Sequence, residues 1–247
     1  DCLYLNVYVP AGVVGKVDTP EETLLPVMVW FHGGGFQQGS GRRIEYDGRY
    51  LAERGIVVVT LNYRIGALGF LVSSKDGILG NFGLMDQRAA MEWVKTNIKS
   101  FGGDPNNITL FGNSAGAVMI GLHLSMSGAG HLFQKAILQS NPVGYRFRSV
   151  VVADFIGEAL KKAVDCRDLA CLRAERVDEI LRAQEKLMGV PRSVGDFFTW
   201  SPTLTREMRV RLGVDGADGG WIHRSSGGGS DEHGGGGGSS GHSHWGT

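Results

Sequence analysis

The sequence lacks several features that would place the protein in other functional classes. Its 25 basic residues balance its 25 acidic ones, so nothing favours nucleic acid or an anionic membrane surface as a partner. No apolar run approaches the roughly 18 residues that a membrane-spanning helix needs. The chain opens on Asp1 with neither a methionine nor an apolar leader, an absence that is uninformative if the chain is a piece of a longer protein. Its 247 residues suffice for one α/β domain or a large part of one.

Segments with strand-like and helix-like patterns alternate along the chain. Short apolar runs with β-branched residues predict strands at residues 3–9, 24–31, 56–62, 107–111 and 135–139. Helical patterns are found at residues 46–54, 82–100, 117–125, 152–163 and 177–188. This alternation predicts an α/β fold with a mainly parallel sheet and helices on both faces.

The function is organised around a serine, Ser114, between the strand at 107–111 and the helix at 117–125. Gly112 stands two residues before it and Gly116 two residues after it, a spacing typical of the nucleophile elbow. The sharp turn would lift the serine Oγ clear of the sheet, and side chains at either glycine would collide with neighbouring elements. The helix N-terminus would offer free N–H groups to an oxyanion. The alternative is a glycine-rich turn with a helix-capping serine.

A second motif, His-Gly-Gly-Gly-Phe at residues 32–36, follows the strand at 24–31 directly. Three bare glycines allow backbone N–H groups to approach a ligand atom closely, as in the oxyanion-hole loop of lipases and esterases. A flexible turn is the alternative, although such a turn does not usually separate a buried strand from an aromatic residue. His32 precedes the serine, whereas this kind of fold supplies its base last, so we expect His32 to lie beside the loop.

Two charged residues are expected to have a structural role. Arg64 follows the strand at 56–62, and an arginine in the interior must be paired. Asp86, near the start of the helix at 82–100, is the candidate partner.

Five segments resemble the type-B carboxylesterase family, which includes the cholinesterases. They are DCLYLNVYVP at 1–10, PVMVWFHGGGFQQGS at 26–40, LNYRIGALGF at 61–70, GNFGLMDQRAAMEWVKTNI at 80–98 and FGGDPNNITLFGNSAGA at 101–117. Their length, order and spacing make the resemblance specific, and it extends to about residue 205, weakening after 145. It implies an α/β-hydrolase fold and the hydrolysis of small carboxylic esters through a serine acyl-enzyme, without a metal or another cofactor.

The resemblance also implies roles for individual residues. Ser114 would be the nucleophile, and Gly34, Gly35 and Ala115 would donate the oxyanion-hole N–H groups. Asn113 stands where the family usually has glutamate, so a cholinesterase-like cation site is not expected. The family's acid and histidine lie far downstream of the serine, so we expect this chain to be the N-terminal part of a longer enzyme and poorly active alone.

The resemblance places a disulfide between Cys166 and Cys171. A continuous helix would hold these residues too far apart, so the pairing requires a loop, and two free thiols are the alternative. Cys2 would be unpaired, because its partner in the family lies upstream. A disulfide would indicate an oxidising compartment and hence the secretory pathway.

The composition changes after residue 205. We predict a carboxylesterase-type domain at 1–205 and a disordered Gly/Ser/His-rich tail at 206–247, because the tail has too little apolar surface to offset its ordering entropy. No strand precedes Glu232 and His233, so we expect neither to be catalytic. The tail histidines could bind a metal loosely without any function.

Two hypotheses about function remain. The first is a serine carboxylesterase acting through Ser114. The second is a non-catalytic adhesion or binding protein, like the family's synaptic members, which generally lose the nucleophile. The intact serine favours the esterase, and the oligomeric state is left open.

Overall fold

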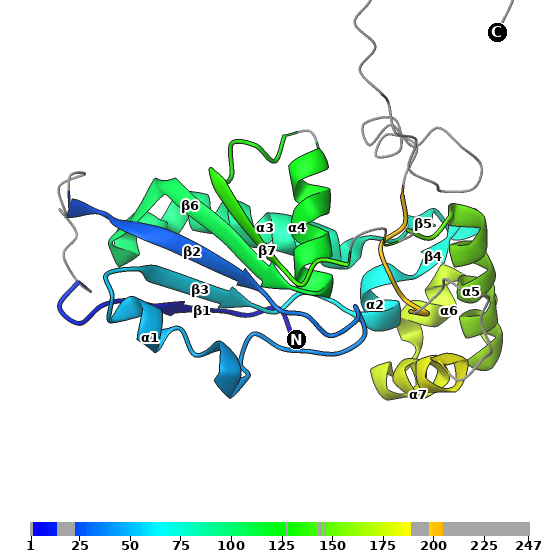
Figure 1. Ribbon diagram of the computed structural model, residues 1–247. Coiled ribbons are helices and arrows are strands. Elements are labelled where there is room, and N and C mark those ends of the chain that lie inside the picture. The colour runs from blue at the N-terminus through cyan, green and yellow to red at the C-terminus, as the bar shows by residue number, and fades with distance from the viewer. Residues whose placement is uncertain are drawn as a thin grey trace, which may run out of the picture.

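A five-stranded sheet forms the centre of the computed structural model, which describes residues 2–13, 23–126, 128–142, 145, 147–188 and 198–204 (Figure 1). The order is β1 (Leu5–Tyr8), β3 (Val57–Leu61), β2 (Leu25–Phe31), β6 (Gly103–Asn113) and β7 (Lys135–Gln139). β3, β2, β6 and β7 run parallel, and β1 is antiparallel to β3. The mainly parallel sheet is confirmed, whereas the direction of β1 was not predicted.

Seven α-helices lie within the described residues. They are α1 (Arg49–Ala52), α2 (Gly66–Phe70), α3 (Phe82–Asn97), α4 (Ala115–Ser125), α5 (Val150–Ala163), α6 (Leu169–Ala174) and α7 (Val177–Met188). A small hairpin of β4 (Val72–Ser73) and β5 (Ile78–Leu79) precedes α3. No helix in this part of the chain is long and apolar enough to cross a membrane.

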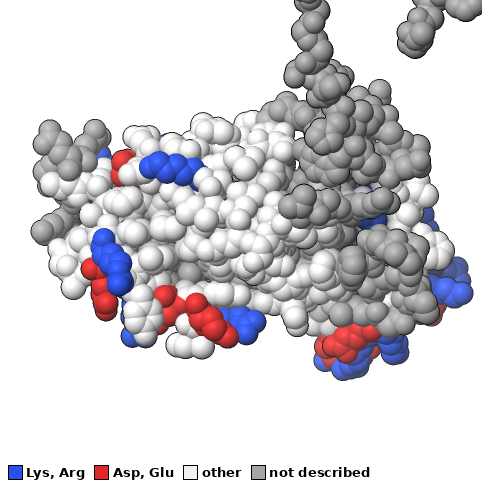
Figure 2. All heavy atoms as spheres, in the orientation of Figure 1, with Lys and Arg blue, Asp and Glu red and all other residues white. Residues whose placement is uncertain are grey.

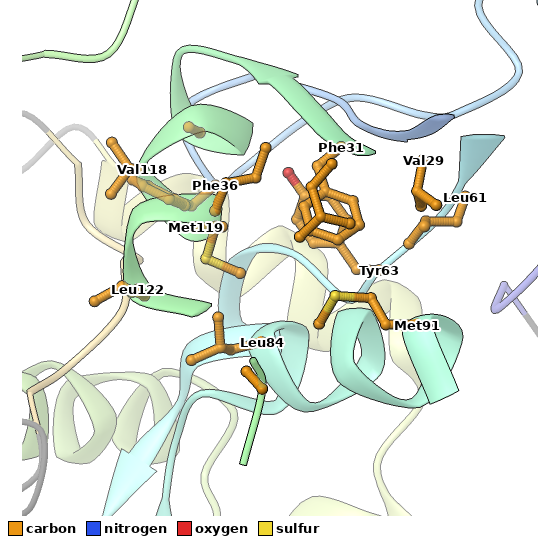
Figure 3. Close-up of a cluster of buried hydrophobic side chains, with 14 of the residues drawn as sticks. Val29, Phe31, Phe36, Leu61, Tyr63, Leu84, Met91, Val118, Met119 and Leu122 are labelled. Atoms are coloured by element: carbon orange, nitrogen blue, oxygen red, sulfur yellow. The ribbon is translucent and has the colours of Figure 1, made fainter. Parts of the chain in front are cut away.

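The main core lies between the sheet and the helices α3 and α4. Alternate residues of β2, including Val29 and Phe31, are fully buried on this face. Figure 3 shows Met91 of α3 and Met119 of α4 pointing into the same interior, and all of these side chains belong to one buried cluster. The short helix α1 lies on the opposite face, because the backbone just before it contacts Val58, which points away from the main core.

One predicted helix is largely wrong. Residues 46–54 form only the single turn of α1, preceded by a 3-10 turn at Ile44–Tyr46. Asp47 is extended at ψ 112°, and its carboxylate accepts the N–H of Arg49 at 3.0 Å. A side chain that binds the backbone in this way competes with the helix, which explains the break. The helix predicted at 82–100 ends at Asn97 and tightens into a 3-10 turn that Gly102 closes with φ 77°.

The helices α5, α6 and α7 lie together at one side of the sheet (Figure 1). α5 is anchored to the β4–β5 hairpin by Lys161, whose buried ammonium contacts Ser73 Oγ at 2.8 Å, Asp76 Oδ2 at 2.6 Å and Glu158 Oε1 at 2.6 Å. Burial lowers the pKa of Lys161, but the hydrogen bonds to Asp76 and Glu158 outweigh it and raise the pKa overall. The charge is therefore retained and fully paired, as burial requires.

Residues 198–204 form a segment that packs against the domain, with an isolated β-bridge between Arg148 and Thr203. Arg148 donates hydrogen bonds to the carbonyl groups of Phe198 and Thr199. The Asn81 amide binds both backbone groups of Thr203, at 2.8 and 2.9 Å. The predicted tail at 206–247 lies outside the described residues, and so the domain boundary at 205 stays a prediction.

Surface charges of both signs lie side by side on the face shown in Figure 2. Exposed ion pairs such as Arg43–Glu45 and Arg182–Asp178 bring opposite charges together on the surface. No large area of a single sign is visible on this face, in keeping with the balanced composition.

Candidate active site

Ser114 occupies a strained turn between β6 and α4. Its backbone has φ 52° and ψ −117°, which places a non-glycine residue in the left-handed region of φ. Its N–H donates to the carbonyl of Gln139 at the end of β7, at 3.0 Å, and its carbonyl accepts the N–H of Val118 at 3.0 Å. Neighbouring elements therefore impose a conformation that costs of order 1–3 kcal/mol.

The glycines on either side of Ser114 have no room for a side chain. A Cβ on Gly116 would lie 2.1 Å from the carbonyl oxygen of Phe31 on β2. A Cβ on Gly112 would lie 2.9 Å from the same oxygen and 3.0 Å from Ile120 of α4. The predicted crowding by strand and helix is confirmed.

The Ser114 hydroxyl does not cap the helix that follows it. Ser114 is the N-cap residue of α4, but its side chain accepts no hydrogen bond from the first turn. Its Oγ forms no hydrogen bond with any residue that the structure describes. The N-terminal N–H groups of an 11-residue helix lie directly behind this free hydroxyl.

The glycine loop after β2 lies against Ser114. A Cβ on Gly33 would be 3.4 Å from the Cβ of Ser114. Gly34 and Gly35 have φ values of 121° and 60°, which favour glycine. The Gly34 carbonyl accepts the N–H groups of Gln37 and Gln38, both at 3.1 Å, which fixes the loop as a tight turn. Within the described ranges, the N–H groups of Gly34, Gly35 and Ala115 form no hydrogen bond.

Aromatic rings surround the outer side of this loop. A Cβ on Gly35 would lie 2.4 Å from the ring of Phe198, so the ring rests on the glycine. Phe198 meets Phe36 edge-on at 5.8 Å between ring centroids, and Tyr145 lies 5.7 Å from Phe36. No local sequence signal identified this group, because its members come from segments far apart in the chain.

His32 is built into the core beside the loop, where we expected it. Its Nδ1 donates to the Gly33 carbonyl at 2.8 Å, and its ring stacks on Tyr63 at 4.3 Å. The Tyr63 hydroxyl donates to the His32 carbonyl at 2.5 Å. Burial lowers the pKa of His32, so its imidazole is neutral at physiological pH. These contacts assign it a role in holding the loop.

Of the other two described histidines, one is bonded within the core and one is exposed. His123 is buried in α4 and pairs through Nε2 with Oε1 of Gln87 at 2.9 Å. Burial lowers its pKa to about 3. His131 lies on the surface. Among the residues that the structure describes, no histidine is hydrogen-bonded to Ser114, so none stands ready to act as its base.

The predicted pair of Arg64 and Asp86 is confirmed. The guanidinium donates to both carboxylate oxygens, at 2.8 and 2.7 Å, and the Arg64 backbone N–H adds a third bond at 2.9 Å. The hydrogen bond to Asp86 raises the pKa of Arg64. The pair joins the exit of β3 to α3, although the Arg64 side chain is 36% exposed rather than buried.

The predicted disulfide between Cys166 and Cys171 is also confirmed. Cys166 lies in the loop before α6 and Cys171 within that helix, so the pairing uses a loop as the geometry requires. The two Cα atoms are 5.4 Å apart. Cys2 is free and exposed.

Comparisons with known proteins agree with this architecture. The sequence matches the model of the carboxylesterase family over residues 1–211. Acetylcholinesterase of Bungarus fasciatus is 36% identical over 247 aligned residues, covering 90% of this chain and 39% of that protein. Para-nitrobenzyl esterase of Bacillus subtilis (strain 168) is 52% identical over 143 residues, covering 57% and 28%.

A solved structure of a PNB esterase has the same fold. It superimposes with a TM-score of 0.75 at 37% identity, covering 87% of this chain and 46% of that one. The predicted α/β-hydrolase fold is thereby confirmed. The chain spans less than half the length of each of these relatives. On the family match and the shared fold, the chain belongs to the carboxylesterase family.

Proposed function

We propose that this chain carries the nucleophile and the oxyanion-binding loop of a carboxylic ester hydrolase, and that Ser114 forms the acyl-enzyme. The observation that carries this proposal is the strained turn of Ser114 beside the glycine loop, in which the Oγ forms no hydrogen bond with any described residue. A structural serine gains nothing from such a conformation, whereas a nucleophile needs an exposed hydroxyl.

The reaction follows from the groups that surround Ser114. Its Oγ attacks the ester carbonyl carbon while a general base takes its proton. The developing oxyanion accepts hydrogen bonds from the N–H groups of Gly34, Gly35 and Ala115, and each such donor is typically worth about 3 kcal/mol. The C–O bond then breaks and the alcohol leaves with the proton. Water attacks the acyl-enzyme, releasing the acid and restoring the hydroxyl.

We propose that the general base and the acid that orients it come from residues outside the described ones. Two observations support this proposal: His32 and His123 are buried and bonded elsewhere, and His131 forms no hydrogen bond with Ser114. We therefore propose that the activity belongs to the longer protein and that the 247-residue chain alone turns over ester poorly.

The aromatic rings beside the loop bound the space for substrate. Phe198 rests on Gly35, and Phe36 meets Phe198 edge-on. We propose that these rings contact the substrate next to its carbonyl, which favours small esters with an apolar part. The disulfide supports folding in an oxidising compartment, as in the secretory pathway.

A chemical-rescue experiment tests the proposed function. The 247-residue chain, its Ser114→Ala variant and the control Ser125→Ala are incubated with a nitrophenyl ester and increasing imidazole. Ser125 is on the same helix and only binds the Gly121 carbonyl, at 3.0 Å. We expect the rate difference between the wild-type chain and Ser114→Ala to grow with imidazole, because the added base replaces the missing one.

The control should behave as the wild-type chain does. Equal rates in the wild-type chain and Ser114→Ala at every imidazole concentration would remove Ser114 from the mechanism. A non-catalytic binding protein, the alternative hypothesis, predicts that result.

A further inference from the structure

A pocket of about 410 Å³ lies away from the candidate active site. It opens where α2, α5, α6 and α7 meet the β4–β5 hairpin. Its lining includes neither Ser114 nor the glycine loop, and none of the rings of Phe36, Tyr145 and Phe198. Its volume falls within the usual range of small-molecule sites. The reaction proposed for Ser114 does not use this pocket.

Most of the lining is aliphatic. Seven large aliphatic residues line the space: Leu68, Leu71, Ile78, Leu160, Leu169, Leu172 and Ile180. Four of them are themselves almost completely buried, so the walls are firmly packed: Ile78, Leu160, Leu172 and Ile180. A surface of this kind favours a flexible or aromatic apolar group of the ligand.

The charged groups at the pocket leave one positive charge unbalanced. Arg64 is neutralised by Asp86, and Asp76 is neutralised by Lys161. Arg173, the remaining charged lining residue, is exposed and forms neither an ion pair nor a hydrogen bond with the described part of the chain. The pocket thus combines an apolar interior with a single available guanidinium.

The disulfide holds this wall in place. Leu169 lies inside the short loop that Cys166 and Cys171 close, and Leu172 and Arg173 follow directly after it. The disulfide therefore restrains the part of the wall that Leu169 and Leu172 supply and the start of α6 that carries Arg173. This placement limits the ordering cost of binding a ligand there.

We propose that this pocket binds a monoanionic amphiphile, with its apolar chain against the leucines and its anionic group on Arg173. The charge balance favours one negative charge, because Arg173 is the one charged lining residue without a partner among the described residues. A cation would be repelled by Arg173, and a purely polar anion would leave the aliphatic walls in contact with water. The inference is independent of the role proposed for Ser114.

Octanoate is the probe for this site, with octylammonium and octan-1-ol as ligands of equal chain length. Calorimetric titration of the 247-residue chain should show saturable 1:1 binding of octanoate, weaker binding of octan-1-ol and the weakest binding of octylammonium. Arg173→Gln should weaken octanoate about fivefold, the effect of a favourable exposed ion pair, and leave octan-1-ol unchanged. Arg167→Gln, within the loop that the disulfide closes but outside the pocket lining, should change neither.

A pocket-filling variant and the methyl signals locate the binding. Leu169→Trp should abolish binding of octanoate and octan-1-ol, with thermal unfolding confirming that the variant is folded. In the wild-type chain, octanoate should shift the NMR methyl signals of Leu172 and Ile180. Absence of octanoate binding, octylammonium binding as tight as octanoate, or shifts confined to Val118 near the serine would each overturn the proposal.

Discussion

At the scale of single residues, the strained turn of Ser114 depends on two nearby glycines, Gly112 and Gly116, which have no side chains. Both flanking glycines approach the Phe31 carbonyl so closely that a methyl group could not be inserted. Close backbone approach therefore requires glycine here, independently of chemistry. The glycines of the motif avoid steric clashes, and this allows the turn to place a hydroxyl at the end of a central strand.

A glycine pair on α4 tests this steric argument. Gly116→Ala should destabilise the protein by about 1–3 kcal/mol, because its Cβ would sit 2.1 Å from a backbone oxygen. Gly121→Ala is the matched control: its Cβ would meet nothing closer than 3.9 Å, and alanine should stabilise the helix by up to about 1 kcal/mol. Urea unfolding measures both, and equal effects of the two substitutions would refute the steric account.

His123 gives a second prediction at this scale. Its Nε2 proton binds Gln87, and its buried Nδ1 has no described partner, so a second proton would be unsatisfied. Burial lowers its pKa from 6.5 to about 3. The unfolded chain therefore binds more protons than the folded one between these values, and this stability contribution is present above pH 6.5 and lost as the pH falls toward 3.

The measurement is the free energy of unfolding at two pH values. From pH 7.5 to pH 5, His123 should contribute a loss of about 2 kcal/mol. His123→Gln should remove that part of the pH dependence, while His131→Gln, at an exposed position, should not. An unchanged pH dependence in His123→Gln would show that another group is responsible.

At the scale of elements, the sequence predicted best where a single periodic pattern decided the structure. β7 and α7 have the predicted bounds, because each is one uninterrupted pattern with clear ends. The helix expected at 46–54 was shortened by the Asp47 side chain, a local competition that periodicity does not detect. α2 and the β4–β5 hairpin are too short to give a periodic signal.

Some parts of the candidate site could be predicted from sequence and others could not. Ser114 and the glycine loop stand in contiguous motifs, and so their elements could be placed from sequence. The contact of Phe198 with Gly35 joins segments more than 160 residues apart. Such a contact is set by tertiary packing, through the hydrogen bonds of Arg148 and Asn81, and no local pattern encodes it.

The disulfide gives a prediction at the scale of elements. Replacing both Cys166 and Cys171 by serine should destabilise the α6 region by about 2 kcal/mol, the loop-entropy contribution of a short closed loop. Octanoate binding should weaken as well, because Leu169, Leu172 and Arg173 lose their fixed turn. Hydrogen exchange of α6 and calorimetry measure the two effects, and Cys2→Ser is the control, since Cys2 is free and exposed. Unchanged exchange in α6 would contradict this role.

At the scale of the whole molecule, the described part contains the strained turn of Ser114 and the glycine loop, but none of its histidines is hydrogen-bonded to Ser114. The sheet, α3 and α4 form the rigid frame that holds the first two parts. Phe198, which Arg148 holds through its backbone carbonyl, packs against Gly35 of that loop. We propose that a base from outside the described residues approaches Ser114.

Mass spectrometry after treatment with a fluorophosphonate, in the presence of imidazole, tests the central claim most directly. The account predicts one covalent adduct on the 247-residue chain, located on Ser114, absent from Ser114→Ala and retained in Ser125→Ala. An adduct on a different serine, or an adduct that persists in Ser114→Ala, would contradict the assignment of Ser114 as the nucleophile.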